Sequence, residues 1–527
     1  MKFTLSSLVS LAVIAAADQA NCAGTNATNS LNVTTLTGRY TGLVDKRFPG
    51  TRQFRSIAYA EPPIQSRRWL PPRKLHPSSE HHYSYDLPPS CPQFMSATPA
   101  FLSSYLGDGA LIDNGNESYT SGGSGVNTSE DCLHLAVWTP VNATSRSKFP
   151  VLFWIYGGGF STGGINTPYY DAASWVEKSQ SHIVVSVNYR VNIFGFPNAK
   201  DLTDQNVGLL DQRMALEWVR DNIEAFGGDP TAITQMGQSA GSMSIDAAAH
   251  SFYQDPIARA NILLSGTVAM GAPTIDPAFS SFTFIARNFG CGGDNSTASE
   301  IDCMRSVPFS DIINFIGKHT DSQSQPALSF TPVLDERLVF SDYAARFRAG
   351  KVAHVPTILA NTANEATSFA PFDPRTPNVG PPQEMLTPVN LQLFVCPTWN
   401  FTVARNELDI PVYRYQYAGN FPNTTPLNWT GAFHGSDIPL VFGTYEKVKG
   451  LGESTELEIE TSRVMQDHIL AFVKDPVNGP KALGWEPTPS QGGKVARFGT
   501  GGKAIQYVDA VEVDGACFGA GEYDPFP

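Results

Sequence analysis

Short apolar runs alternate with longer amphipathic stretches through the middle of the chain. Residues 151–156 and 183–188 have the pattern of buried strands, and residues 209–226 repeat apolar side chains at helical spacing. Further strand patterns follow at residues 231–236, 262–264, 355–360 and 411–415, and small residues over 240–249 predict a helix. This alternation predicts the α/β class, in which a mostly parallel sheet carries helices on both faces.

The first residues are typical of a signal peptide. Lys2 precedes an apolar run of 13 residues from Leu5 to Ala17, which ends in three alanines. The run is shorter than the roughly 20 residues that cross a bilayer, and no later segment is apolar for long enough. We therefore expect residues 1–17 to be removed and residues 18–527 to form one secreted domain, with no integral membrane association.

Composition and charge exclude several classes of protein. Charged residues make up 16% of the 527-residue chain, well below the roughly 25% of an average protein, and 42% of residues are apolar. This balance excludes disorder for most of the chain. The 36 Lys and Arg residues against 49 Asp and Glu residues give a net charge of −13, with no long basic run. Nucleic acids and anionic membranes are therefore not expected as partners.

Two further features fit a secreted protein. Nine Asn-x-Ser/Thr sequences could accept N-linked glycans, at Asn26, Asn32, Asn116, Asn127, Asn142, Asn295, Asn400, Asn423 and Asn428. The seven cysteines are too few for a disulfide scaffold, so any bridges would close loops on a fold with its own core. Cysteine spacing alone does not define the pairing.

A candidate nucleophile lies between a predicted strand and a predicted helix. The sequence Gly237-Gln238-Ser239-Ala240-Gly241 matches Gly-x-Ser-x-Gly, in which a strained turn lifts the serine hydroxyl clear of a sheet. A flexible loop matches the same pattern, so the strand and the helix around it carry the argument. Ser239 is the predicted nucleophile.

A second glycine turn follows the predicted strand at residues 151–156. Gly157-Gly158-Gly159 is no phosphate cradle, because no Gly-Lys-Ser/Thr follows it. We expect an oxyanion hole formed by the backbone N–H groups of Gly158, Gly159 and Ala240. The loss of one such donor typically costs about 3 kcal/mol of transition-state stabilisation.

Longer segments around these turns resemble the type-B carboxylesterase family, which includes fungal lipases, carboxylesterases and cholinesterases. The resemblance is carried by residues 188–192, 206–219 and 222–230 together with the serine turn, and Glu130-Asp131-Cys132-Leu133 is similar to a second signature of the family. It implies the α/β-hydrolase fold and hydrolysis of carboxylic esters through an acyl-enzyme. No metal or cofactor is expected, because the chain has no His-Glu-x-x-His or paired Cys-x-x-Cys motif.

The base and the acid must follow the serine in the order acid, then histidine. Five histidines lie downstream, and chemistry alone does not choose among His250, His319, His354, His434 and His468. The segment 431–439 is similar to the family's catalytic histidine segment, which implies His434 as general base. Glu365, just beyond the predicted strand at 355–360, is the expected acid; Asp335 is its main rival, and Asp437 lies too near His434 along the chain.

The resemblance also implies finer features. Gln238 stands where the family usually has Glu, so we expect the protonated form of His434 to be stabilised less than in relatives. Ser265 is similar to a serine that lies near the acid in the family. Activity is expected to fall below about pH 6.5 as the histidine takes up a proton.

Two disulfides are implied by the resemblance, Cys91–Cys132 and Cys291–Cys303. The first closes a loop, residues 91–132, whose apolar side chains either pack on the body or form a mobile lid. A lid would favour the alternative of a triacylglycerol lipase or sterol esterase; a third alternative is an inactive adhesion-type homologue. Small-molecule or lipid esters are the expected substrates. The sequence leaves open the acyl length, the oligomeric state and the pairing of Cys22, Cys396 and Cys517.

Overall fold

A computed structural model describes residues 31–94, 128–270, 276–292, 299–370, 373, 375–425, 427, 429–447 and 452–527. The predicted signal peptide, Cys22 and most of the loop 91–132 lie outside these residues. The same holds for five of the candidate glycosylation sites, Asn26, Asn116, Asn127, Asn295 and Asn428. The division into a leader and one domain stays a prediction.

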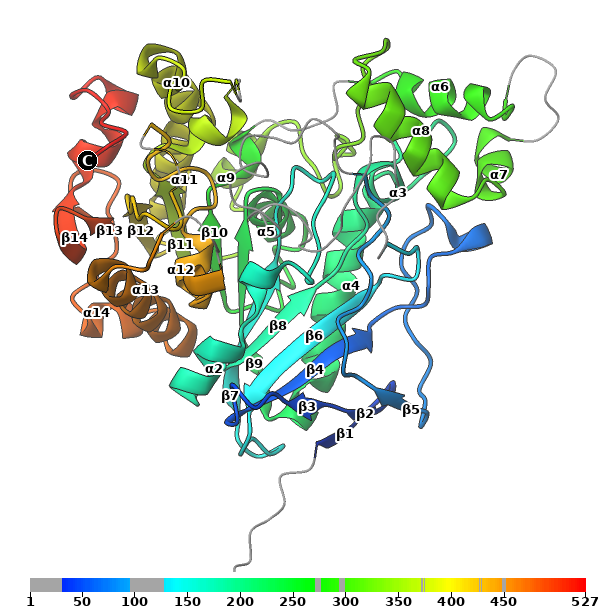
Figure 1. Ribbon diagram of the computed structural model, residues 1–527, viewed down its shortest axis with the longest axis horizontal. Helices are drawn as coiled ribbons and strands as arrows, with labels where there is room; N and C mark the ends of the chain where they lie inside the picture. The colour runs from blue at the N-terminus through cyan, green and yellow to red at the C-terminus, as the bar shows by residue number, and fades with distance from the viewer. Residues whose placement is uncertain are drawn as a thin grey trace, which may run out of the picture.

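An 11-stranded sheet runs through the molecule in the order β14-β13-β12-β11-β10-β9-β7-β8-β6-β4-β3 (Figure 1). From β8 to β13 all neighbours are parallel, and the strands at both edges are antiparallel. The strands are β3 (Leu43–Val44), β4 (Thr51–Ala58), β6 (His134–Pro140), β7 (Phe149–Ile155), β8 (Ile183–Val187), β9 (Gly228–Gln238), β10 (Ala260–Leu264), β11 (Thr357–Thr362), β12 (Val412–Tyr417), β13 (Lys494–Thr500) and β14 (Lys503–Asp509). A small second sheet contains β1 (Asn32–Thr35), β2 (Gly38–Thr41) and β5 (His81–Tyr83).

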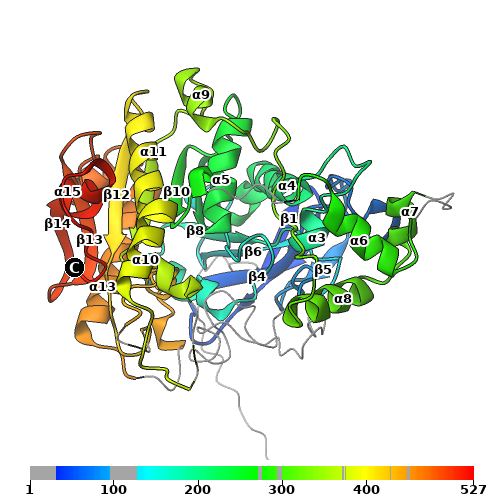
Figure 2. The same cartoon turned by 90° about the horizontal axis from the view of Figure 1, so that it is seen from above.

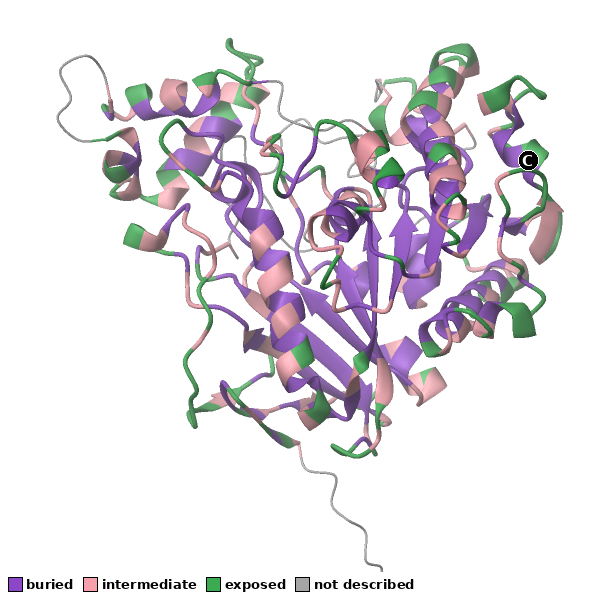
Figure 3. Ribbon diagram, turned by 180° about the vertical axis from the view of Figure 1, so that it is seen from behind, coloured by how far each residue is buried: buried purple, intermediate pink, exposed green. Residues whose placement is uncertain are grey.

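Helices cover both faces of the large sheet, which confirms the predicted α/β class (Figures 1 and 3). On one face α4 (Val207–Asn222) contacts β9, and α5 (Ala240–Ser251) contacts β9 and β10. On the other, α2 (Ala173–Ser179) contacts β4 and β6, and α13 (Glu456–Lys474) contacts β13 and β14. The remaining α-helices of the described residues are α3 (Asn192–Gly195), α6 (Ser280–Asn288), α7 (Glu300–Arg305), α8 (Phe309–Asp321), α9 (Tyr343–Arg348), α10 (Gln383–Asn390), α11 (Cys396–Asn406), α12 (Ile438–Phe442), α14 (Gly479–Ala482) and α15 (Ala510–Asp514).

The predicted strands and helices lie where the hydrophobic pattern indicated. Every residue of β8 and β12 is buried, as expected for strands that helices cover on both faces. The helix predicted at 209–226 ends at Asn222 and continues as a 3₁₀ turn, Ile223–Phe226. That turn stops at Gly227, whose φ of 97° belongs to the left-handed region where glycine commonly ends a helix.

Helices α6, α7 and α8 gather at one end of the molecule, where they share a separate apolar cluster that includes Phe282, Met304 and Ile312 (Figure 2). The disulfide Cys291–Cys303 joins the segment after α6 to α7. A second bridge, Cys91–Cys132, closes the candidate lid loop. Both pairings agree with the prediction. The third bridge, Cys396–Cys517, pairs two cysteines whose partners the sequence left open, 121 positions apart.

The four candidate glycosylation sites within the described residues divide into two groups. Asn32, Asn142 and Asn400 are exposed. Asn423 is 1% exposed, and its amide nitrogen donates to the Tyr445 carbonyl at 3.3 Å and to Ser454 Oγ at 3.1 Å. The structure therefore contradicts the prediction at Asn423, because this amide is enclosed and already used in packing.

Candidate active site

Ser239 is the single residue between a strand and a helix. It follows the last residue of β9 and precedes the first residue of α5, with φ 54° and ψ −121°. Glycines on either side make this turn possible, since a Cβ on Gly241 would lie 2.1 Å from the Ile155 carbonyl oxygen. A non-glycine residue in such a conformation costs about 1–3 kcal/mol and persists only where its surroundings impose it. The geometry is that of a nucleophile elbow.

The turn Gly157–Gly159 lies directly against this serine. A Cβ on Gly157 would lie 2.9 Å from Ser239 Cβ, and Gly158 and Gly159 have φ values of 109° and 60°. In the described part of the chain, no group accepts a hydrogen bond from the N–H of Gly158 or Gly159. Ala240 is the first residue of α5, so its N–H has no partner within the helix. Among the described residues, the N–H groups of all three predicted oxyanion donors therefore lack an acceptor.

Glu365, the first residue of the 3₁₀ helix Glu365–Phe369, meets His434 from a separate loop. His434 Nδ1 lies 2.6 Å from Glu365 Oε2, and both side chains are buried. The other carboxylate oxygen, Oε1, accepts from the Thr362 N–H at 2.7 Å, which anchors the acid to the end of β11. An ionised carboxylate only accepts hydrogen bonds, so Nδ1 carries the proton and Nε2 is left as the basic nitrogen.

The basic nitrogen faces the residue before the serine. His434 Nε2 lies 3.0 Å from Gln238 Nε2, whose N–H donates to it. Among the described residues, no hydrogen bond joins Ser239 Oγ to His434. Such catalytic hydrogen bonds are often long without substrate and tighten in the reacting complex. The sequence predicted that residue 238 influences the charge of His434, but it did not predict this hydrogen bond.

Two aromatic rings and a second carboxylate surround His434. The centroids of Phe369 and Phe394 lie 5.1 and 5.2 Å from the imidazole centroid. Phe369 is 58% exposed, so it borders the open side of the site. Asp437 is buried nearby and accepts from Tyr415 Oη at 2.9 Å; burial raises the pKa of this carboxyl to about 6.

Asp335, the rival acid, and His250 both make contacts that support the fold. Asp335 Oδ1 accepts from the N–H groups of Leu338 and Val339 at 2.7 and 2.9 Å, which closes a turn away from His434. His250 is buried between Tyr343 and Phe347, and desolvation lowers its pKa to about 4. Ser265 donates its N–H to the Ala360 carbonyl at 2.8 Å. Its hydroxyl makes no hydrogen bond among the described residues, so the predicted position of Ser265 near the acid stays a prediction.

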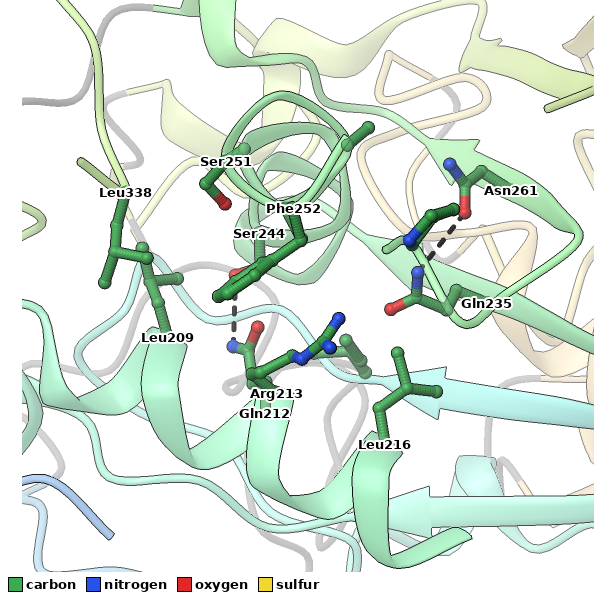
Figure 4. Close-up of a pocket in the computed structure, with 15 residues that line it drawn as sticks. Leu209, Gln212, Arg213, Leu216, Gln235, Ser244, Ser251, Phe252, Asn261 and Leu338 are labelled. Atoms are coloured by element: carbon green, nitrogen blue, oxygen red, sulfur yellow. Dashed lines mark hydrogen bonds between the residues drawn. The ribbon is translucent and has the colours of Figure 1, made fainter. Parts of the chain in front are cut away.

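An apolar pocket of about 300 Å³ opens beside the serine turn. Phe160, next to the glycine turn, and Met243, one helical turn after Ser239, both line it, as do Val268, Val339 and Phe340. A neighbouring pocket between α4 and α5 is far smaller, at about 20 Å³ (Figure 4). Four of its polar side chains are paired with one another, since Gln212 donates to Ser244 at 3.1 Å and Gln235 to Asn261 at 3.4 Å. Only the larger pocket suits a substrate group.

The fold agrees with the known proteins that the chain resembles. A family model described as the carboxylesterase family matches residues 27–385 and 382–514. The chain belongs to this family. It is 37% identical to a chlorogenic acid esterase of Aspergillus niger over 92% of this chain and 94% of the relative. It is 35% identical to secreted lipase 5 of Gibberella zeae over 93% of this chain and 94% of that protein.

A solved structure agrees with the fold of this carboxylesterase. A thermophilic PNB esterase matches it with a TM-score of 0.73, at 24% identity, over 91% of this chain and 98% of that one. The protein is thus a carboxylic ester hydrolase with the α/β-hydrolase fold, as the sequence predicted. In the residues that the structure describes, no three His, Cys, Asp or Glu side chains are grouped so that they could hold a metal ion. No described helix is long and apolar enough to cross a membrane.

Proposed function

We propose that this carboxylesterase is a secreted serine hydrolase with the triad Ser239, His434 and Glu365. The observation that carries the proposal is the 2.6 Å contact between His434 and Glu365 beside the strained Ser239 turn. Glu365 holds the imidazole in the tautomer that leaves Nε2 basic and stabilises the cation formed during attack. The unpaired N–H groups of Gly158, Gly159 and Ala240 are suited to stabilise the developing oxyanion.

The reaction proceeds in two halves. Ser239 Oγ forms a bond to the ester carbonyl carbon while its proton passes to His434 Nε2. The π electrons of the carbonyl move to its oxygen, which becomes the oxyanion. When the C=O bond forms again, the bond to the alcohol oxygen breaks; the alcohol takes the proton from His434 and leaves an acyl-serine. Water next attacks the acyl carbon, gives its proton to His434, and Ser239 regains a proton as the carboxylic acid leaves.

The apolar pocket supports a substrate with a compact hydrophobic group. Its volume of about 300 Å³ is at the lower end of the range for small-molecule sites, which suits a short or medium acyl or aryl group better than a sterol. The relatives named above act on chlorogenic acid or are lipases. A lipase with a lid is the second candidate, because the pocket lining is almost wholly apolar.

The decisive experiment compares wild type and Ser239→Ala on p-nitrophenyl esters of increasing acyl length. Wild type should hydrolyse short and medium esters, and the variant should lose at least about 10⁴-fold in kcat/KM. Equal rates above the uncatalysed background would refute Ser239 as the nucleophile, and background rates for both proteins would leave the inactive adhesion-type homologue. A preference for long acyl chains together with activation at an emulsion interface would replace the esterase proposal with the lipase.

Secretion is proposed from the signal peptide pattern, the relatives that are named as secreted, and the three disulfides. Asn32, Asn142 and Asn400 are the exposed candidates for glycosylation, whereas Asn423 is not proposed. Expression in a secreting host should give a chain that begins near residue 18 and loses mass on deglycosylation. Three Asn→Gln substitutions at the exposed sites should each reduce that loss. A secreted chain with no glycan would refute the glycosylation proposal alone.

A further inference from the structure

Gln238 contributes a side-chain contact to the base of the site. Its amide nitrogen lies 3.0 Å from His434 Nε2, and both side chains are almost fully buried, at 1% and 3% exposed. Because Nδ1 donates to Glu365, the neutral ring has a single lone pair, on Nε2. That lone pair is the acceptor that the Gln238 N–H meets.

Two glycines border this amide. A Cβ on Gly157 would lie 2.5 Å from Gln238 Oε1, and a Cβ on Gly435 would lie 3.4 Å from Gln238 Nε2. The slot for the amide therefore exists because residue 157 lacks a side chain, whereas a Cβ at residue 435 would make only an ordinary contact with the amide. Its oxygen faces the glycine turn at 157–159 and its nitrogen faces His434, so packing and the hydrogen bond agree on one orientation.

The charges beside the ring come from two other elements. Glu365 follows β11 and bonds Nδ1; Asp437 precedes α12, lies within electrostatic range of His434 and Glu365, and is bonded by Tyr415 from β12. Phe369 and Phe394 cover the ring with uncharged surface. A glutamate in place of Gln238 would bring a third carboxylate to the imidazole of His434, in contact with its basic nitrogen, Nε2.

We propose that Gln238 is a positioning residue, which holds His434 as the neutral Nδ1–H tautomer with its lone pair directed at the nucleophile turn, and which adds no charge that would favour protonation of the ring. This inference rests on the proposed serine mechanism. During attack the Ser239 proton takes the Nε2 lone pair, so the Gln238 N–H gives up its hydrogen bond as the serine forms its bond to carbon. The role of the amide is thus to orient the resting ring, and the hydrogen bond is released when the base acts.

The test uses Gln238→Glu, which nearly preserves shape, and Gln238→Leu, which removes the hydrogen bond without adding charge. In Gln238→Glu the acidic limb of kcat/KM should move up by about one pH unit, because an opposite charge favours imidazolium. In Gln238→Leu that limb should move up by less, and kcat should fall about tenfold with KM little changed. The exposed Gln491→Glu is the matched charge control and should leave the profile in place.

A second readout does not depend on turnover. Nitrogen-15 NMR of wild type should show His434 protonated on Nδ1 at pH 8, and its titration midpoint should rise in Gln238→Glu along with the kinetic limb. An Nε2–H tautomer in wild type, or an unmoved midpoint in Gln238→Glu, would overturn the role of Gln238. If wild type hydrolyses no ester, the proposed function fails, yet the NMR result still decides whether Gln238 positions the ring.

Discussion

The two sides of the active site are built in different ways. On the nucleophile side, Ser239 and the Gly157–Gly159 turn are held by backbone contacts that only glycine permits. On the acid–base side, Glu365 and His434 are 69 positions apart and are held by side chains, among them Phe369 and Phe394. The nucleophile side requires glycines, which lack side chains, whereas the acid–base side is held together by contacts between side chains. Substitutions should therefore damage the two sides by different routes.

The largest effect is expected on the acid–base side, from Glu365→Gln. A glutamine amide can donate to Nδ1, which would favour the wrong tautomer and leave Nε2 protonated. We expect kcat/KM to fall by about 10⁴-fold with little change in fold, since the shape is retained. The exposed Glu384→Gln should retain full activity. A loss of less than tenfold in Glu365→Gln would mean that another carboxylate orients the histidine.

The nucleophile side can be tested with two adjacent glycines. Both Gly158 and Gly159 have positive φ, but a Cβ at Gly158 would lie 2.5 Å from the Thr162 carbonyl oxygen, whereas one at Gly159 meets nothing within 4 Å. We expect Gly158→Ala to move the turn and lose about 10²–10³-fold in kcat, as when an oxyanion donor is removed. Gly159→Ala should lose about tenfold, from backbone strain alone. Single-turnover acylation rates measure both, and equal losses would contradict the steric argument.

The disulfides offer a test of stability on the acid–base side. Cys396 begins α11, directly after the turn of π-helix Leu391–Val395 that carries Phe394 onto His434. The Cys396–Cys517 bridge spans 121 positions, so its loss should lower the free energy of unfolding by about 4–5 kcal/mol in the chain-entropy model. Replacing both cysteines by Ser should also lower kcat, because the support for Phe394 is loosened.

The matched control replaces both Cys291 and Cys303 by Ser. Their bridge spans 12 positions within the outlying helices, α6, α7 and α8. This replacement should cost about 3 kcal/mol or less and leave kcat unchanged. Thermal unfolding and ester hydrolysis of the two variants together separate general stability from support of the site. An equal loss of kcat in both variants would show that the outlying helices also hold the acid–base side.

What the sequence could predict follows the same division. The nucleophile side is local, so strand, glycine, serine and helix are all visible within residues 151–160 and 231–249. His434 and Glu365 could be chosen among five histidines and several acids only through resemblance, because long-range folding brings them together. The Cys396–Cys517 bridge could not be predicted for the same reason. Asn423 shows a second limit of sequence-based prediction: the Asn-x-Ser/Thr pattern carries no information about burial.

The smallest expected effect concerns Asp437, the second carboxyl beside His434. Burial raises its pKa from 3.8 to about 6, so the folded protein holds this proton more tightly than the unfolded chain does. Its ionisation therefore costs stability: the penalty is absent below about pH 4, grows between about pH 4 and pH 6, and reaches about 3 kcal/mol above that range.

Asp437→Asn should remove this penalty while an amide oxygen can still accept from Tyr415. Relative to wild type, the variant should gain in thermal unfolding midpoint from pH 4 to pH 7, then stay level at higher pH. The exposed Asp86→Asn is the control and should follow wild type throughout. A constant difference between Asp437→Asn and wild type would mean that the carboxyl ionises alike in the folded and unfolded chains. Its neighbours would then compensate for burial, and the acid–base side would tolerate a second full negative charge next to Glu365.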